Sequence, residues 1–111
     1  MIKDLYLEMS EIRKDITDLA YKTYHKGSSD LAWHIFHQFN DALEIVEAII
    51  KECLQPGPGY EGVVALHDKT PFLIDRLSYA IDCEPRIKKE CKAIIDKVFK
   101  LIEEDKGDYG E

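Results

Sequence analysis

Apolar residues recur along the chain at the three- and four-residue spacing of amphipathic helices. This periodicity predicts four helices, at residues 3–25, 30–54, 71–82 and 85–105. Residues 106–111 are expected to form a frayed tail. Residues 60–69 are apolar enough for either a short helix or an irregular buried link. No stretch alternates apolar and polar residues between turn signals, so no strand is expected. The pattern therefore predicts a single all-α domain over residues 1–111, folded as a four-helix bundle.

Residues that stop or start helices separate the predicted segments. Gly27 is a natural stop for the first helix, and residues 28–30 offer N-caps for the second. The Pro-Gly-Pro-Gly run at residues 56–59 ends the second helix, because proline removes a backbone donor and glycine frees the backbone. Thr70-Pro71 and Pro85 are typical of helix starts, with proline in the first turn.

The second predicted helix carries a narrow polar stripe opposite a broad apolar face. His37, Asp41 and Glu44 are spaced i, i+4 and i+7, so they stack on successive turns. Stacked carboxylates repel each other, and a divalent cation between them reverses the sign of that interaction. Oxygen ligands suit Mg²⁺ or Mn²⁺, and an added imidazole favours Mn²⁺ or Zn²⁺. The simpler alternative is a solvated helix face.

Composition narrows the classes of function. The chain has 111 residues, 45% of them hydrophobic, and a formal net charge of −7. That charge repels nucleic-acid phosphates, and no basic patch with interleaved aromatics is present, so no nucleic-acid partner is expected. No apolar run is long enough to span a membrane, and no signal peptide is evident. A helical chain of this size often completes its core by pairing with a copy of itself, so a homodimer is expected.

The three cysteines and the known catalytic motifs add little. Cys53, Cys83 and Cys91 are spread out and odd in number, which is typical of free thiols in a reducing cytoplasm. The chain contains no Gly-x-Ser-x-Gly elbow, no phosphate-binding Gly-x-x-x-x-Gly-Lys loop, no zinc-finger spacing and no repeated Glu-x-x-His. What remains is a set of acids from two helices. If the second and third helices pack antiparallel, Asp75 can face Asp41 and Glu44.

This pattern resembles the all-α nucleoside triphosphate pyrophosphatases, the MazG-like and dimeric dUTPase-like group. The family carries Glu-Glu-x-x-Glu on one helix and Glu-x-x-Asp on the next. Asn-Asp-Ala-Leu-Glu at residues 40–44 stands in the place of the first motif, and continues as Ile-Val-Glu-Ala-Ile. Phe-Leu-Ile-Asp at residues 72–75 stands in the place of the second, followed by Arg-Leu-Ser-Tyr-Ala. The resemblance covers about residues 30–82.

The resemblance implies Mg²⁺-dependent hydrolysis of a nucleoside triphosphate to a monophosphate and pyrophosphate. It assigns Asp41, Glu44 and Asp75 as catalytic metal ligands, and His37, one turn before Asp41, is a candidate fourth ligand. Asn40 and Phe72 depart from the family pattern, because each replaces an expected Glu. Fewer anionic ligands weaken a metal site, so weakened or lost activity is part of the expectation. The lysines of the last helix are candidate phosphate contacts: Lys88, Lys89, Lys92 and Lys97.

Two other hypotheses fit the same residues. One is a non-enzymatic helical homo-oligomer or interaction module, with Trp33, Phe36 and Phe39 as a subunit contact. The other is a Zn²⁺ or Mn²⁺ site of a different kind, built from the carboxylates and histidines of the second helix: His34, His37, Asp41 and Glu44.

Overall fold

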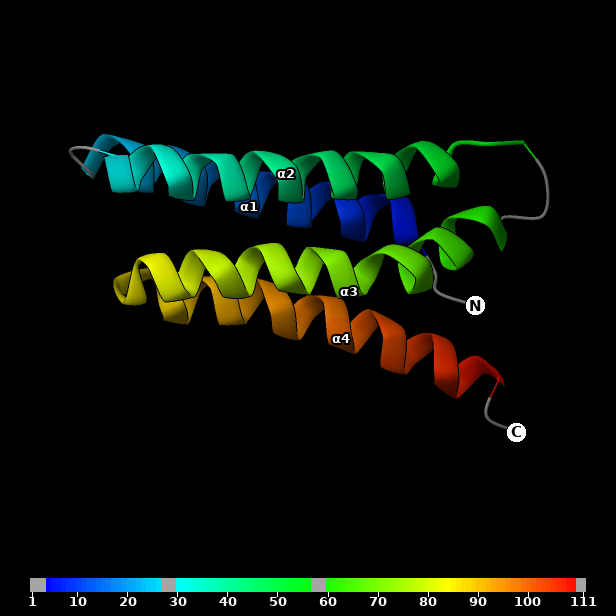
Figure 1. Ribbon diagram of the computed structural model, residues 1–111. Helices are drawn as coiled ribbons and strands as arrows, with labels where there is room; N and C mark the ends of the chain where they lie inside the picture. Colours follow the sequence, from blue (N-terminus) through cyan, green and yellow to red (C-terminus); the bar gives the residue numbers. More distant parts are fainter. Residues whose placement is uncertain (1–3, 27–29, 57–59, 110–111) are drawn as a thin grey trace.

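The chain folds as an all-α bundle in the computed structural model, which describes residues 4–26, 30–56 and 60–109. Within these residues there are four α-helices and one short 3-10 turn, and no strand: α1 (Leu5–Lys26), α2 (Asp30–Cys53), α3 (Tyr60–Cys83), η1 (Pro85–Ile87) and α4 (Lys88–Tyr109). Successive helices run in opposite directions, with α1 and α2 in one layer and α3 and α4 in the other (Figure 1). The bundle measures 48 × 26 × 18 Å. No helix in the described part of the chain combines the length and apolarity that crossing a membrane requires. The predicted all-α four-helix architecture is confirmed.

Most helix boundaries lie close to their predicted positions. α1 and α2 agree with the prediction to within two residues, and α2 ends at Cys53, ahead of Pro56. The other predicted punctuation at residues 27–29 and 57–59 lies outside the described residues. α4 extends to Tyr109, past residue 106 where the predicted tail begins.

The third helix is the main correction to the prediction. It begins at Tyr60 instead of at Pro71, and it contains Pro71 in its interior. Thr70 is buried and does not cap a helix start; its hydroxyl donates to the Leu66 carbonyl oxygen at 2.5 Å. An interior proline costs a helix about 3 kcal/mol. Burial of Val63 and Leu66, on the same face of α3 as Leu73, outweighs that cost.

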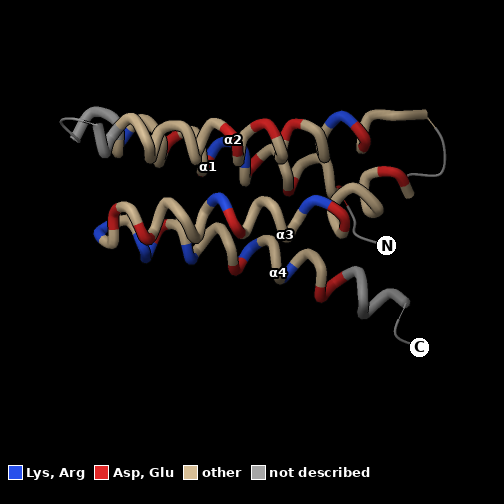
Figure 2. The backbone as a smooth tube through the Cα atoms, in the orientation of Figure 1, with Lys and Arg blue, Asp and Glu red and all other residues tan. Residues whose placement is uncertain are grey.

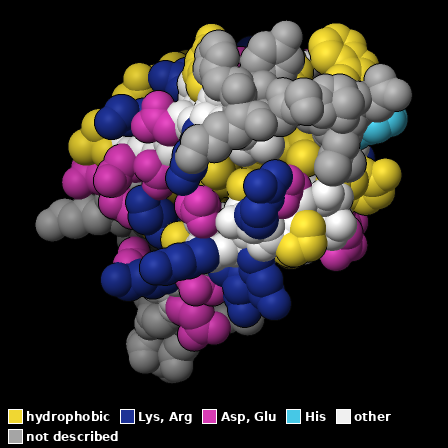
Figure 3. Space-filling view, turned by 90° about the vertical axis from the view of Figure 1, so that its left-hand side faces the viewer, with side chains coloured by type: hydrophobic (Ala, Val, Ile, Leu, Met, Phe, Trp, Pro, Cys, Tyr) yellow, Lys and Arg dark blue, Asp and Glu magenta, His cyan; other side chains and the backbone are white. Residues whose placement is uncertain are grey.

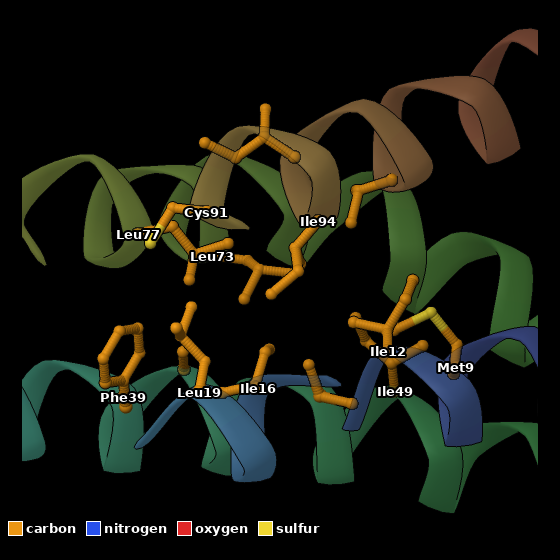
Figure 4. Close-up of a cluster of buried hydrophobic side chains, with 14 of the residues drawn as sticks. Met9, Ile12, Ile16, Leu19, Phe39, Ile49, Leu73, Leu77, Cys91 and Ile94 are labelled. Carbon is orange, nitrogen blue, oxygen red and sulfur yellow. The ribbon is translucent and has the colours of Figure 1, made fainter. Parts of the chain in front are cut away.

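The core lies between the two layers. Side chains from all four helices fill it, and the labelled residues in Figure 4 point into the space between α1 and α2 on one side and α3 and α4 on the other. Phe39 is completely buried there, so the hypothesis that it joins Trp33 and Phe36 in a subunit contact is wrong for Phe39. Helix α2 packs extensively against both α1 and α3, which makes it the central helix of the bundle.

Two ion pairs join α1 to α4. The Lys97 ammonium lies 2.6 Å from an Asp15 carboxylate oxygen, and the Lys22 ammonium lies 3.2 Å from a Glu90 oxygen. All four side chains are partly exposed, so each pair contributes little to stability. Their main effect is to fix the position of α4 beside α1, which it contacts only sparsely.

Gly62 permits a close approach of two helices where α3 begins. A Cβ atom on Gly62 would lie 2.6 Å from the Cys53 sulfur and 3.2 Å from the Cys53 Cα. The end of α2 and the first turn of α3 therefore approach each other more closely than any other residue at this position would allow. This contact fixes how the two helices are aligned along their length.

A charged cap starts the last helical segment. The Arg86 guanidinium donates to both Glu84 carboxylate oxygens, at 2.7 and 2.9 Å, and the Arg86 backbone N–H donates to the same carboxylate at 3.1 Å. Glu84 thereby serves as the N-cap of η1, ahead of Pro85. These hydrogen bonds, first those of the guanidinium, lower the pKa of Glu84 from 4.5 to about 2.

The low pKa of Glu84 gives a testable pH dependence. Because the folded pKa lies below the ordinary value, the cap stabilises the fold fully above pH 4.5 and loses that effect as the pH falls toward 2. We expect a side-chain carboxyl NMR titration to place the Glu84 midpoint near 2, and the Arg86→Met variant to return it toward 4.5. A midpoint near 4.5 in the unaltered chain would show that the cap does not form in solution.

Candidate functional site

An open groove of about 440 Å³ runs between α2 and α3, and two of the three predicted acids, Asp41 and Glu44, line it. Each helix contributes one wall. The residues that line it are Asp41, Glu44, Ile45 and Ala48 from α2, and Lys69, Phe72 and Arg76 from α3. On α2 they occupy positions i, i+3, i+4 and i+7, and on α3 positions i, i+3 and i+7, which is why each set shares one face of its helix.

The two walls carry opposite charges. The α2 wall presents the Asp41 and Glu44 carboxylates, and the α3 wall presents Lys69 and Arg76. Figure 2 shows basic segments of α3 alongside the acidic segments of α2. Arg76 donates a hydrogen bond to the Gln38 amide oxygen at 3.2 Å. The side chains of Asp41, Glu44 and Lys69 form no hydrogen bond or ion pair with any described residue, so their charges face the open groove.

The structure brings together only part of the predicted site. Asp41 and Glu44 lie side by side on the groove, as the helical stripe predicted. Asp75 is exposed and is not part of the groove lining. His37 is also exposed, and its ring meets the Trp33 ring edge-on, with centroids 4.4 Å apart.

The donor set limits what metal the groove could hold. Over the described residues, no three His, Cys, Asp or Glu side chains lie close enough to share a metal ion. That holds both for the predicted set with Asp75 and for the set with His34. Two carboxylates do suit an Mg²⁺ that brings phosphate ligands with it, since Mg²⁺ commonly binds one or two carboxylates plus substrate phosphates. Asp41 and Glu44 are therefore the residues of the groove that could ligate such a metal–phosphate complex.

Sequence reasoning missed the two cations that face the acids. Lys69 and Arg76 lie one turn before and one turn after Phe72. The signal was present in this spacing, but it appears only when the third helix is known to begin before residue 70.

Four lysines of α4 that the sequence offered as phosphate contacts do not line this groove: Lys88, Lys89, Lys92 and Lys97. Lys97 pairs with Asp15 on the other side of the bundle. Lys88, Lys89 and Lys92 are exposed near the start of α4. Figure 3 looks at that end of the bundle and shows Lys and Arg side chains gathered over it among acidic ones.

Large apolar side chains are exposed along the outer side of α3. Phe72, in the groove wall, is 61% exposed, and three more large side chains of this helix are at least half exposed: Tyr60, Val64 and Tyr79. A second shallow groove, lined partly by Tyr60 and Val64, shares Lys69 with the first. Several large exposed apolar side chains on one helix are a feature of interaction sites on proteins.

The fold and the groove define a class, an all-α bundle with an open, oppositely charged groove between two neighbouring helices. Comparison of the chain with protein-family models, with curated proteins and with solved structures gives no match.

Proposed function

We propose that the chain functions as a non-enzymatic helical homo-oligomer, an interaction module that associates through the side formed by α2 and α3. The observation that carries this proposal is the exposed apolar surface of α3, centred on Phe72. Burying apolar surface is the main favourable term in protein association. An isolated chain leaves four large side chains of one helix in water.

The groove chemistry favours association over catalysis. Phe72 occupies the position where the resembled family has a metal-binding Glu, and a phenyl ring cannot coordinate a cation. Lys69 and Arg76 offset the negative potential of Asp41 and Glu44, which weakens the attraction for a free divalent ion. Opposite charges on facing walls instead suit a partner that carries both signs.

Sedimentation equilibrium of the purified chain tests this proposal. We expect twice the chain mass at micromolar concentration and a shift toward the single-chain mass on dilution. A single-chain mass at every concentration would overturn it.

A second candidate function is supported by the same four charged residues. Asp41 and Glu44 opposite Lys69 and Arg76 could bind an Mg²⁺ or Mn²⁺ nucleoside triphosphate, with the carboxylates on the metal and the cations on phosphate oxygens. The metal would supply charge neutralisation at the phosphates. With Phe72 at the motif and Asp75 outside the groove, this candidate is a pyrophosphohydrolase-like protein with weakened or lost hydrolysis. Pyrophosphate release that requires Mg²⁺ and disappears in the Asp41→Asn variant would favour it over the oligomer.

A further inference from the structure

We infer that two copies of this chain pair face to face over the α2–α3 groove, about a two-fold axis that runs along the groove. The acidic wall of each copy then faces the basic wall of the other. This inference rests on the proposed self-association and adds which surface is buried and how the copies are oriented.

The arrangement of charge favours this axis over one that runs across the groove. In an isologous pair the same surface meets itself, and the two-fold axis lies in the plane of contact. An axis across the groove would set α2 against α2 and place Asp41 and Glu44 opposite their own copies. An axis along the groove sets α2 against α3, so carboxylates meet Lys69 and Arg76. Like charges placed opposite each other disfavour the first arrangement, and opposite charges favour the second.

The alignment of the two helices makes the charges meet at the same level. The hydrogen bond from Arg76 to Gln38 and the contact of Gly62 with Cys53 fix how α2 and α3 lie alongside each other. In this register Asp41 and Glu44 are level with the part of α3 between Lys69 and Arg76. A two-fold rotation about an axis along the groove leaves each residue at the same position along that axis. Glu44 of one copy therefore comes opposite the part of α3 near Lys69 in the other.

The apolar part of the groove supplies the contact surface. Phe72 projects from the α3 wall, and Ile45 and Ala48 line the α2 wall. The same rotation sets Phe72 of each copy over the α2 wall of the other, at the level between Asp41 and Ile45. Exposed aromatic side chains that enter an apolar recess are the usual energetic centre of an interface.

The net charge of the chain disfavours self-association through most of its other surfaces. At a formal charge of −7, two copies repel each other over most relative orientations. When the two copies pair over the groove, Lys69 and Arg76 of each copy lie opposite the carboxylates of the other, and this reduces the repulsion. The groove therefore combines apolar surface with charges that complement a second copy of the same chain.

A charge-exchange experiment tests the arrangement. In a dimer of the Glu44→Lys variant, the introduced lysine of each copy faces Lys69 of the other. In a dimer of the Lys69→Glu variant, the introduced glutamate of each copy faces Glu44 of the other. We expect each variant alone to dimerise at least about tenfold more weakly than the unaltered chain. An equimolar mixture of the two restores both opposite-charge contacts, so a heterodimer of near-normal affinity is expected by native mass spectrometry and sedimentation.

A matched control and the possible contrary results distinguish failure of the inferred arrangement from failure of the proposed self-association. Glu47→Lys makes the same change at an exposed α2 residue outside the groove lining, and it should leave dimerisation unaltered. Single variants that dimerise normally would overturn the choice of surface. Single variants that weaken the dimer without rescue in the mixture would overturn the axis. An unaltered chain that never dimerises would overturn the proposed function itself.

Discussion

Replacing Phe72 by glutamate is expected to convert the proposed dimer into single chains at concentrations where the unaltered protein associates. The change removes a side chain that is 61% exposed and central to the inferred contact. It also adds a carboxylate to a groove that already holds Asp41 and Glu44. Central aromatic residues at interfaces typically cost about 2 kcal/mol or more when removed, which corresponds to roughly 30-fold in the dissociation constant. Sedimentation velocity over a concentration series measures this shift.

Phe99 provides a matched control for that experiment. It is a phenylalanine of similar exposure, 49%, but lies on α4 and does not line the groove. The Phe99→Glu variant should retain the dimer and the helical circular dichroism of the unaltered chain. If Phe72→Glu and Phe99→Glu behave alike, the exposed surface of α3 is not the contact.

The Phe39→Ala substitution is expected to have the largest effect on folding. Phe39 has no exposed surface and lies in the core labelled in Figure 4. Truncating a buried phenylalanine removes apolar contacts and leaves a cavity, at a cost of about 3–5 kcal/mol. A domain of this size is stable by only about 5–15 kcal/mol, so a large part of its stability is lost. Urea unfolding followed by circular dichroism measures the difference.

Trp33 is the comparison for Phe39. It is 54% exposed and stacks on Phe36, with ring centroids 6.3 Å apart, so Trp33→Ala should cost no more than about 1 kcal/mol. Both variants are to be compared at one low protein concentration, where association contributes least. Equal losses of unfolding free energy would contradict the burial of Phe39.

The presence of the four helices was predictable from the sequence, because each helix carries a long apolar stripe at helical spacing. The start of α3 was not, because Thr70-Pro71 carries a strong local start signal while the stabilisation of residues 60–69 comes from distant contacts with α2. Phe39 was grouped with Trp33 by residue type, whereas its phase on α2 places it among the buried positions. Local signals thus located the elements, and packing decided where one of them begins.

The candidate site was predictable only on the helix whose phase the sequence defined well. Asp41 and Glu44 share an edge of α2 because of their spacing alone. On α3 each residue step turns the side chain by about 100°, so the choice between Asp75 and Arg76 depends on how that helix is rotated against α2. The structure turns Arg76 to the groove and Asp75 away from its lining. Packing across the whole bundle sets that rotation, and no short motif reports it.

Sedimentation equilibrium of the unaltered chain, with and without Mg²⁺ and a panel of nucleoside triphosphates and with pyrophosphate assayed in the same samples, distinguishes self-association from nucleotide hydrolysis. We expect a dimer whose dissociation constant does not change with metal or nucleotide, and no release of pyrophosphate. A single-chain mass, or a chain that binds Mg²⁺ nucleotides in the groove and releases pyrophosphate, would contradict it.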